Sequence, residues 1–351
     1  MKIYMICNRA VEETHDGLRF QDTGKERAQA SFRIANCTIP EDGKGTRASY
    51  TILEDKFMPG YDEIADIVEG KKPNLMGTAQ VFYDVYQDML NEKSEKGDTL
   101  FFMHGFATDF DSTLDHIYDL YELYIKPEES PIKNMIYVSW PSLKSKLLTY
   151  WNDQDDAEAT GQMLGRVYSN LHKFFLTTFE TLGLDRCKHK IHLMAHSMGC
   201  TLLREMLEAI PSHRLFPLFG ETILLHSDVE HDVFEPGKPY TKLEPLSERT
   251  HIYIHRSDDA LRISRFTKNF NKRLGFKGPK DKHDLNDETF VIDTTHVSNE
   301  NVPLMERVVD HWGYLNRQPV VNHIIQVLRG MDTDDIHYDR KHRKYEQYYI
   351  L

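Results

Sequence analysis

The chain has 351 residues, a formal net charge of −12 and a hydrophobic share of 40%. This composition is typical of a globular protein, and the acidic balance argues against nucleic acid as a main partner. Its four cysteines stand far apart in the sequence, so we expect neither a disulfide framework nor a zinc knuckle, and we expect a cytoplasmic location. Because no apolar run reaches about 18 residues, we expect no stable membrane insertion.

Short apolar runs alternate with helical patterns along most of the chain. This alternation predicts an α/β fold in which a central, mostly parallel sheet carries helices on both faces. The predicted strands are residues 3–7, 100–103, 135–139, 191–195, 222–225, 252–255 and 290–292. The predicted helices are residues 80–90, 114–124, 159–179, 201–210 and 320–328.

The first hundred residues are less regular than the rest. Residues 32–37 and 48–53 predict antiparallel strands at one edge of the sheet, because a glycine-rich turn separates them. We find no repeat and no linker composition, which favours one domain over residues 1–351. Its parts are N-terminal edge strands and a helix over 1–98, a core with the candidate catalytic motifs over 99–330, and a charged C-terminal tail over 331–351.

The segment around Ser197 has the strongest chemical signature. An apolar strand runs into Ala195-His196-Ser197-Met198-Gly199, and a helical pattern follows. A nucleophile elbow needs this strand–turn–helix context, with small residues two positions before and after the serine so that strand and helix approach closely. Ala195 and Gly199 satisfy that need. The alternative is a serine that merely caps the helix, and the flanking elements favour the nucleophile.

A second motif follows the strand at 100–103, where the chain continues with His104-Gly105-Phe106. In serine hydrolases of this architecture, the loop after the corresponding strand supplies one oxyanion-hole N–H, and the residue after the nucleophile supplies the other. We therefore predict the backbone N–H groups of Phe106 and Met198 as the two donors. A glycine turn without such a role is the alternative.

A serine nucleophile needs a histidine base and an acid that orients it, in the chain order serine, acid, histidine. After Ser197, the aspartates that follow predicted strands are Asp228, Asp258 and Asp259. His311, before the last predicted helix, is the favoured base, and His296 is the alternative. For the acid, the position after the later strand favours Asp258, although Asp228 on the earlier loop stays a candidate.

The remaining polar motifs in the sequence do not indicate a cofactor. His226, Asp228, His231 and Asp232 lack a known metal-binding spacing, so a loop beside the active site explains them better than a metal site. No phosphate-binding glycine loop is present, and we expect no nucleotide cofactor. The basic residues between 262 and 282 could attract an anionic substrate or a membrane surface, but a solvated helix face is the favoured interpretation.

The chain resembles the bacterial α/β-hydrolase family long catalogued as a domain of unknown function. The matching pieces are Cys7-Asn8-Arg9, His104-Gly105-Phe106, Ser139-Trp140-Pro141-Ser142, Ala195-His196-Ser197-Met198-Gly199, the stretch from Ser227 to Phe234, Ser257-Asp258-Asp259-Ala260-Leu261 and Asp310-His311-Trp312-Gly313-Tyr314. The resemblance implies the α/β-hydrolase fold and a triad of Ser197, Asp258 and His311, and it implies little about substrate. Cys7 stands where the family usually has threonine.

Together these observations predict a serine hydrolase that cleaves acyl esters through an acyl-enzyme on Ser197. Its expected partner is a small-molecule acyl substrate. Esters are the default because an alkoxide is expelled more easily than an amine. The alternatives are an amidase, a peptidase or a thioesterase. A non-catalytic binding protein with the same fold is the alternative from another class, since a fold alone does not establish a function. The oligomeric state is not predicted.

Overall fold

The structure is a computed structural model. It describes residues 1–21, 27–41, 44–53, 78–142, 150–175, 187–258, 260–261, 272–282, 285–297, 311–332, 341–342 and 348–351. Among these residues, no helix is both long enough and apolar enough to cross a bilayer.

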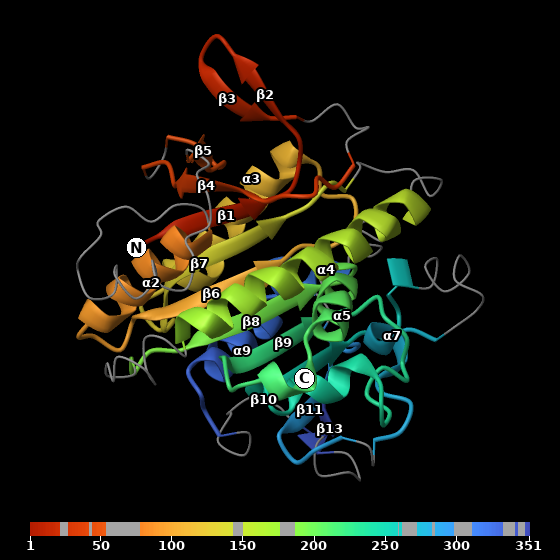
Figure 1. Cartoon of the computed structure of the whole chain (residues 1–351). Helices are drawn as coiled ribbons and strands as arrows, with labels where there is room; N and C mark the ends of the chain where they lie inside the picture. Colours follow the sequence, from red (N-terminus) through yellow and green to blue (C-terminus); the bar gives the residue numbers. More distant parts are fainter. Residues whose placement is uncertain are drawn as a thin grey trace.

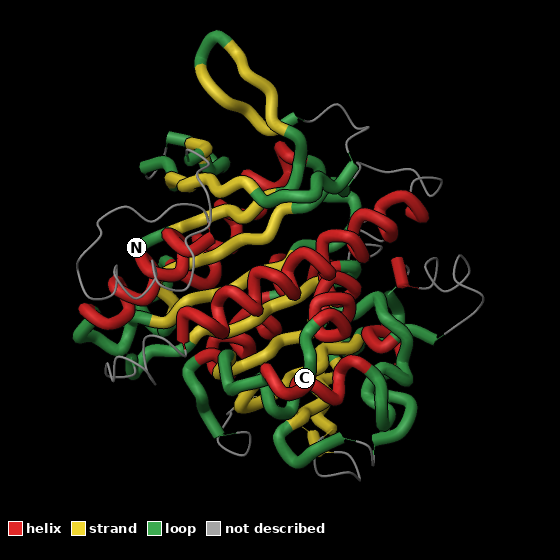
Figure 2. The backbone as a smooth tube through the Cα atoms, viewed as in Figure 1, coloured by secondary structure: helices red, strands yellow, loops and turns green. Residues whose placement is uncertain are grey.

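One large sheet organises the molecule (Figures 1 and 2). Its eleven strands follow the order β12-β13-β11-β10-β9-β8-β6-β7-β1-β4-β5. From β13 to β1 all neighbouring strands are parallel, whereas β4, β5 and β12 pair antiparallel at the two edges. The strands are β1 (Ile3–Cys7), β4 (Arg33–Thr38), β5 (Ser49–Ile52), β6 (Asp98–Met103), β7 (Ile132–Ser139), β8 (Ile191–His196), β9 (Phe219–Leu225), β10 (Ser247–Ile254), β11 (Thr289–Asp293), β12 (Lys341–His342) and β13 (Tyr348–Ile350).

Helices cover both faces of this sheet because its central strands are apolar on both sides. Every residue of β1, β6 and β9 is buried, as expected for strands between two helical layers. The helices are α2 (Thr78–Asn91), α3 (Phe110–Leu120), α4 (Tyr150–Phe175), α5 (Gly199–Ala209), α7 (Leu274–Lys277), α8 (Gly313–Asn316) and α9 (Gln318–Leu328), with a π-helix η1 (Tyr121–Ile125) and 3-10 helices η4 (Ser212–Arg214) and η5 (Pro239–Leu243).

Two apolar clusters lie on the two faces of the sheet, each between the strands and one layer of helices. One contains residues of α2, α4 and α5 packed on the sheet, and the other contains residues of α3, η1 and α9. In Figure 1, α4 and α5 cross the near face and α9 lies behind the strands. The fold class predicted from the sequence, a mostly parallel sheet with helices on both faces, is therefore confirmed.

Three details differ from the sequence-based expectations. β2 (Val11–Thr14) and β3 (Gly17–Phe20) form a separate antiparallel hairpin that the pattern did not indicate. The C-terminal residues, expected only as a charged tail, contribute β13, which pairs parallel with β11. Finally, β9 and β10 begin several residues before the apolar runs. Their polar first halves stay in the sheet because buried Glu221 binds Arg249 and His251 at 2.7 Å and 2.9 Å.

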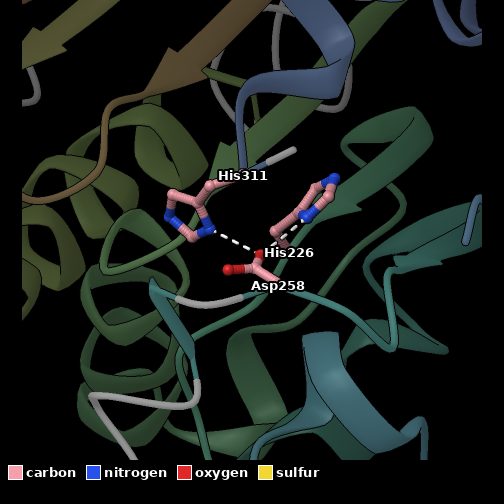
Figure 3. A group of neighbouring side chains, drawn as sticks. All are labelled: His226, Asp258 and His311. Atoms are coloured by element: carbon pink, nitrogen blue, oxygen red, sulfur yellow. Dashed lines mark hydrogen bonds and ion pairs between the residues drawn. The ribbon is translucent and has the colours of Figure 1, made fainter. Parts of the chain in front are cut away.

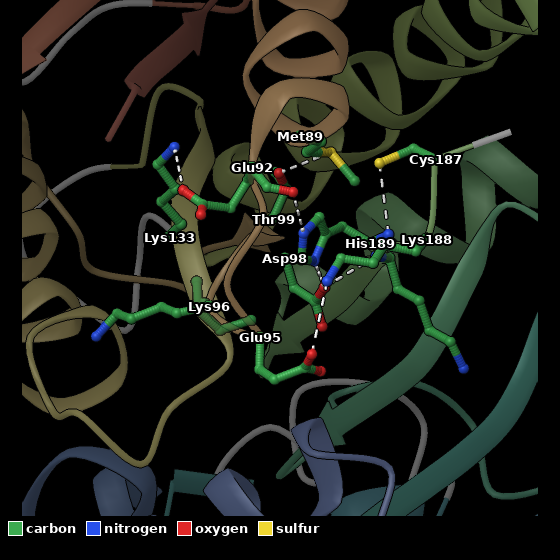
Figure 4. A network of polar contacts seen from close by, with 12 residues as sticks. Met89, Glu92, Glu95, Lys96, Asp98, Thr99, Lys133, Cys187, Lys188 and His189 are labelled. Carbon is green, nitrogen blue, oxygen red and sulfur yellow. Dashed lines mark hydrogen bonds and ion pairs between the residues drawn. The ribbon is translucent and has the colours of Figure 1, made fainter. Parts of the chain in front are cut away.

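A second polar network closes the amino end of the sheet (Figure 4). The carboxylate of Asp98, at the start of β6, accepts hydrogen bonds from Nδ1 of His189 at 3.2 Å and from Nε2 of His192 at 3.0 Å. The backbone N–H of Lys190 adds a third at 3.0 Å. These contacts tie β6 to the start of β8, whose other end carries the candidate nucleophile.

Candidate active site

Ser197 lies on a strained turn between β8 and α5. Its φ is +53°, a left-handed conformation that costs an ordinary residue roughly 1–2 kcal/mol. The turn persists because hydrogen bonds hold it on both sides. The Ser197 N–H donates to the carbonyl of Leu225 at 2.9 Å, and the Ser197 carbonyl accepts from Asp228 N–H at 3.1 Å. This is the elbow geometry predicted from the sequence.

The small residues at the elbow are required by close packing. A Cβ atom at Gly199 would lie 2.4 Å from the carbonyl oxygen of Met103, at the end of β6. Ala195, two residues before the serine, has no exposed surface. Strand and helix therefore meet without space for a side chain at Gly199, and Ala195 is enclosed beside them.

The loop after β6 lies directly against the elbow. A Cβ atom at Gly105 would lie 2.9 Å from Cβ of Ser197 and 2.9 Å from Nδ1 of His196. Phe106 follows this glycine, and Met198 is the N-cap residue of α5. Ala107, in the same loop, also adopts a positive φ of 59°. The structure thus brings together both segments from which oxyanion donors were predicted.

His104 holds this loop in place through a role that the sequence did not reveal. Its Nδ1 lies 2.8 Å from the carbonyl of Gly105, and its Nε2 accepts from the backbone N–H of Trp140 at 3.1 Å. The indole N–H of Trp140 donates to the His104 carbonyl at 3.0 Å, and the two rings stack at 5.1 Å. Burial lowers the pKa of His104 well below its ordinary range, so the ring is neutral, with its proton on Nδ1.

Arg9 supports the same loop from the end of β1. It is buried, and its Nη2 donates to the carbonyl of Thr108 at 2.8 Å. The hydroxyl of Thr108 donates in turn to the carbonyl of Gly105 at 3.3 Å. The Cys7-Asn8-Arg9 and Ser139-Trp140-Pro141-Ser142 segments therefore both act on the loop that faces Ser197, a convergence that only the tertiary structure reveals.

Asp258 and His311 meet at the same end of the sheet. Nδ1 of His311 lies 2.7 Å from Oδ2 of Asp258, and both residues are buried. The other carboxylate oxygen accepts the backbone N–H of Leu261 at 3.0 Å. His311 reaches the elbow through its carbonyl, which lies 2.8 Å from Nε2 of His196, and the rings of these two histidines are 4.7 Å apart.

The charges of this pair favour the ionised forms. Burial raises the pKa of Asp258, but the charge of His311 and the hydrogen bonds of two histidines outweigh it and hold this pKa well below 3.8. Burial lowers the pKa of His311, but the carboxylates of Asp258 and Asp228 outweigh it and raise this pKa above 6.5. None of the hydrogen bonds between described residues joins the Ser197 hydroxyl to His311.

The competing candidates occupy other positions. Asp228 faces Arg273, with Oδ1 at 3.2 Å from Nε. His296 is exposed on the turn after β11. Asp259 lies outside the described residues, as do the basic residues Arg262, Arg265 and Lys268.

A second histidine, His226, contacts the acid as well. Its Nδ1 lies 2.9 Å from the same Oδ2 of Asp258 that binds His311 (Figure 3). One possible ligand atom from each of the three residues lies within 4.8 Å of the other two, and this donor set would suit a zinc ion. The hydrogen bonds among the three side chains already account for their proximity. Among the residues that the structure describes, Asp228, His231 and Asp232 join no such group.

Comparison with known proteins supports the fold. Residues 83–329 match the family described as alpha/beta hydrolase of unknown function (DUF900). No curated protein matches the chain. No solved structure matches it either. The matched region runs from α2 to the end of α9 and includes Gly105, Ser197, Asp258 and His311. Because it covers most of the sequence, the chain belongs to this family of alpha/beta hydrolases.

Proposed function

We propose that this protein is a serine hydrolase that cleaves acyl esters of small molecules through an acyl-enzyme on Ser197. The observation that carries the proposal is the buried hydrogen bond of 2.7 Å between His311 and Asp258, beside a strained serine elbow. A histidine base that an acid orients is the arrangement that activates a serine hydroxyl within its reach.

In the proposed reaction, His311 removes the proton of the Ser197 hydroxyl through Nε2. The serine oxygen then attacks the ester carbonyl and forms a tetrahedral intermediate. Asp258 fixes the imidazole with its proton on Nδ1 and stabilises the imidazolium, which next protonates the leaving alcohol. Water, activated by the same histidine, releases the acid from the acyl-enzyme. In the substrate complex, the Ser197 hydroxyl hydrogen-bonds to His311. Catalytic hydrogen bonds that are long in a free enzyme commonly shorten in this way.

The backbone N–H groups of Phe106 and Met198 are proposed to hold the negative oxygen of the intermediate. Support comes from the close approach of this loop to the serine, since a Cβ atom added at Gly105 would lie only 2.9 Å from Cβ of Ser197. Further support comes from His104 and Arg9, which hold the loop through hydrogen bonds of 2.8 Å each. Preorganised donors of this kind contribute on the order of 10²–10³-fold in turnover.

We propose esters as substrates because an alkoxide leaves more easily than an amine. Amides, peptides and thioesters need the same machinery and remain the alternatives. We also propose the cytoplasm as the compartment, because all four cysteines are free thiols.

A fluorophosphonate probe tests the proposal directly. The full-length protein should be labelled at Ser197, and mass spectrometry should locate the adduct there. Ser197→Ala should abolish labelling and ester turnover, whereas the control Ser169→Ala, whose hydroxyl bonds only within α4 at 3.0 Å, should retain both. Nitrophenyl esters of increasing acyl length, with the matching anilide and thioester, then establish the bond type. A parent protein that neither reacts with the probe nor turns over any of these compounds is a binding protein instead.

A further inference from the structure

His226 and His311 contact the same carboxylate oxygen from opposite sides (Figure 3). Nδ1 of His226 lies 2.9 Å from Oδ2 of Asp258, and Nδ1 of His311 lies 2.7 Å from it. The exposed fraction of both His226 and Asp258 is at most 1%. A serine triad requires only one of these two contacts, so the second histidine needs its own explanation.

The protonation of His226 follows from its partner. An ionised carboxylate only accepts hydrogen bonds, so Nδ1 of each histidine must carry a proton. In His311, this leaves the Nε2 lone pair for the serine proton. In His226, it places the positive end of the N–H dipole on Asp258, opposite His311. The negative charge of Asp258 is therefore shared between two donors.

The backbone at His226 is strained, which is an independent observation. Its φ is +46°, and the other non-glycine residues with positive φ among those described are Ala107 and Ser197. These two belong to the proposed oxyanion loop and the nucleophile. Strain of this kind persists where the surroundings enforce it, and it concentrates at functional sites.

The surroundings of His226 do enforce it. Its N–H still donates to the carbonyl of Tyr253 at 3.1 Å, which continues the ladder between β9 and β10. Gly275 packs directly against the backbone of this turn, since a Cβ atom at Gly275 would lie 2.2 Å from the carbonyl carbon of His226. The chain must therefore turn at His226, and the turn directs its ring toward Asp258.

We propose that His226 is a positioning residue for the serine hydrolase proposed above: its Nδ1–H fixes the carboxylate of Asp258 toward His311 and withdraws part of its negative charge. This inference rests on the proposed function, and it assigns His226 no contact with substrate. It predicts that loss of the Nδ1–H both loosens Asp258 and strengthens its attraction for the His311 imidazolium.

Other titratable groups lie close to His311 and His226. His311 has Asp258 and, farther away, Asp228 as its acids. The ring of His196, from β8, lies 4.7 Å from His311, and the ring of His255 lies 5.9 Å from His226. None of these residues is changed in the test, so a shift reports on His226 alone.

Three variants separate the donor from the shape of the side chain. His226→Asn keeps an N–H near the Nδ1 position and tolerates a positive φ. His226→Gln moves the amide to the Nε2 position, and His226→Leu removes the donor. The first measurement is the titration of the His311 ring by NMR in a Ser197→Ala background, which needs no turnover. The second is the pH profile of kcat/KM with an activated ester.

We expect the His311 midpoint to rise by about one pH unit in the Leu and Gln variants, and to stay near the parent value in the Asn variant. Turnover should fall about tenfold in Leu and Gln and recover in Asn. An unchanged midpoint in both Leu and Gln overturns the proposal, as do equal losses in all three variants. If circular dichroism shows that the His226→Leu variant does not fold, the His226→Gln variant provides the test of the proposal. If the parent fails to label at Ser197, the proposed hydrolase function fails, while the NMR titration still decides whether His226 acts on His311.

Discussion

The guanidinium of Arg273 lies 3.2 Å from the carboxylate of Asp228, and both side chains are almost completely buried. Asp228 follows β9, as Asp258 follows β10, so both acids lie at the same end of the sheet. Arg273 neutralises the first of them, whereas the second contacts His311 directly at 2.7 Å. The ion pair thus gives Asp228 a structural partner, which supports Asp258 as the acid of the proposed triad.

This difference predicts opposite effects of two matched substitutions. Asp258→Asn should lower kcat by roughly 10³–10⁴-fold, by analogy with the protease triad. Asp228→Asn should keep kcat within a few-fold but lower the free energy of unfolding by about 3 kcal/mol, because Arg273 loses one buried partner. Steady-state kinetics and urea unfolding on both proteins check this. A larger loss of kcat in Asp228→Asn would move the acid to the earlier loop.

The elbow predicts that Gly199 accepts no side chain. Gly199→Ala places Cβ 2.4 Å from the carbonyl of Met103, and backbone cannot yield as a flexible side chain does. We expect a loss of about 1–3 kcal/mol for alanine, and more for Gly199→Leu. Gly45→Ala is the control, since its nearest neighbour would be 3.8 Å away. Thermal melting should separate the two, and a Gly199→Leu variant as stable as the parent would contradict the elbow geometry.

Gly105 should affect activity more than stability. In Gly105→Ala, the new methyl group would press on Cβ of Ser197 at 2.9 Å and displace the loop that carries the proposed oxyanion donor at Phe106. We expect kcat to fall on the order of 10²–10³-fold, the effect of losing one such donor. Fluorophosphonate labelling and ester kinetics measure the effect, and unaltered kcat would exclude this loop from the oxyanion hole.

The pH dependence of activity follows from the raised pKa of His311. Its ring must be neutral to accept the serine proton, so kcat/KM should decline at low pH with a midpoint above 6.5. Asp258→Asn removes the main acid that opposes burial, and the midpoint of the remaining activity should then shift to lower pH. A midpoint that stays in place after this substitution would separate His311 from the titration.

The same pair contributes to stability over a limited pH range. The Asp258 contribution is present above the unfolded pKa of 3.8 and is lost as pH falls. The His311 contribution is complete below the unfolded pKa of 6.5 and is lost as pH rises through the higher folded value. The pair should therefore stabilise the fold most between these two values, and Asp258→Asn should flatten this part of the curve of unfolding free energy against pH.

Glu221, at the opposite end of the sheet, should affect stability without affecting catalysis. Burial raises its pKa, but His251 and Arg249 outweigh burial and lower it to about 2. Glu221→Gln should therefore cost about 3 kcal/mol at pH 7, and this difference should vanish as pH falls from 4.5 toward 2. The exposed Glu248, paired with Lys190 at 2.5 Å, is the control. Because exposed pairs contribute little, Glu248→Gln should leave the unfolding free energy nearly unchanged.

Much of the fold could be predicted from local patterns. The apolar runs of β1, β6 and β8 and the helical spacing of α5 are sequence-local, because a parallel strand buried on both faces must be apolar throughout. The turn at Ser197 could also be predicted, because all its parts follow one another in the sequence: the strand, a small residue, the serine, a second small residue and the helix. The order of serine, aspartate and histidine then limited the partners of Ser197 to a few residues.

The contacts that favour Asp258 and His311 among those partners join distant segments. His226 lies 32 positions before Asp258 in the sequence, and no periodicity indicates that their side chains meet. Arg273 neutralises Asp228 only because the segment before α7 folds back on the loop after β9, and Trp140 supports His104 only because β7 ends beside β6. Local sequence determines which elements form, whereas hydrogen bonds and ion pairs between their ends depend on how the completed sheet aligns them.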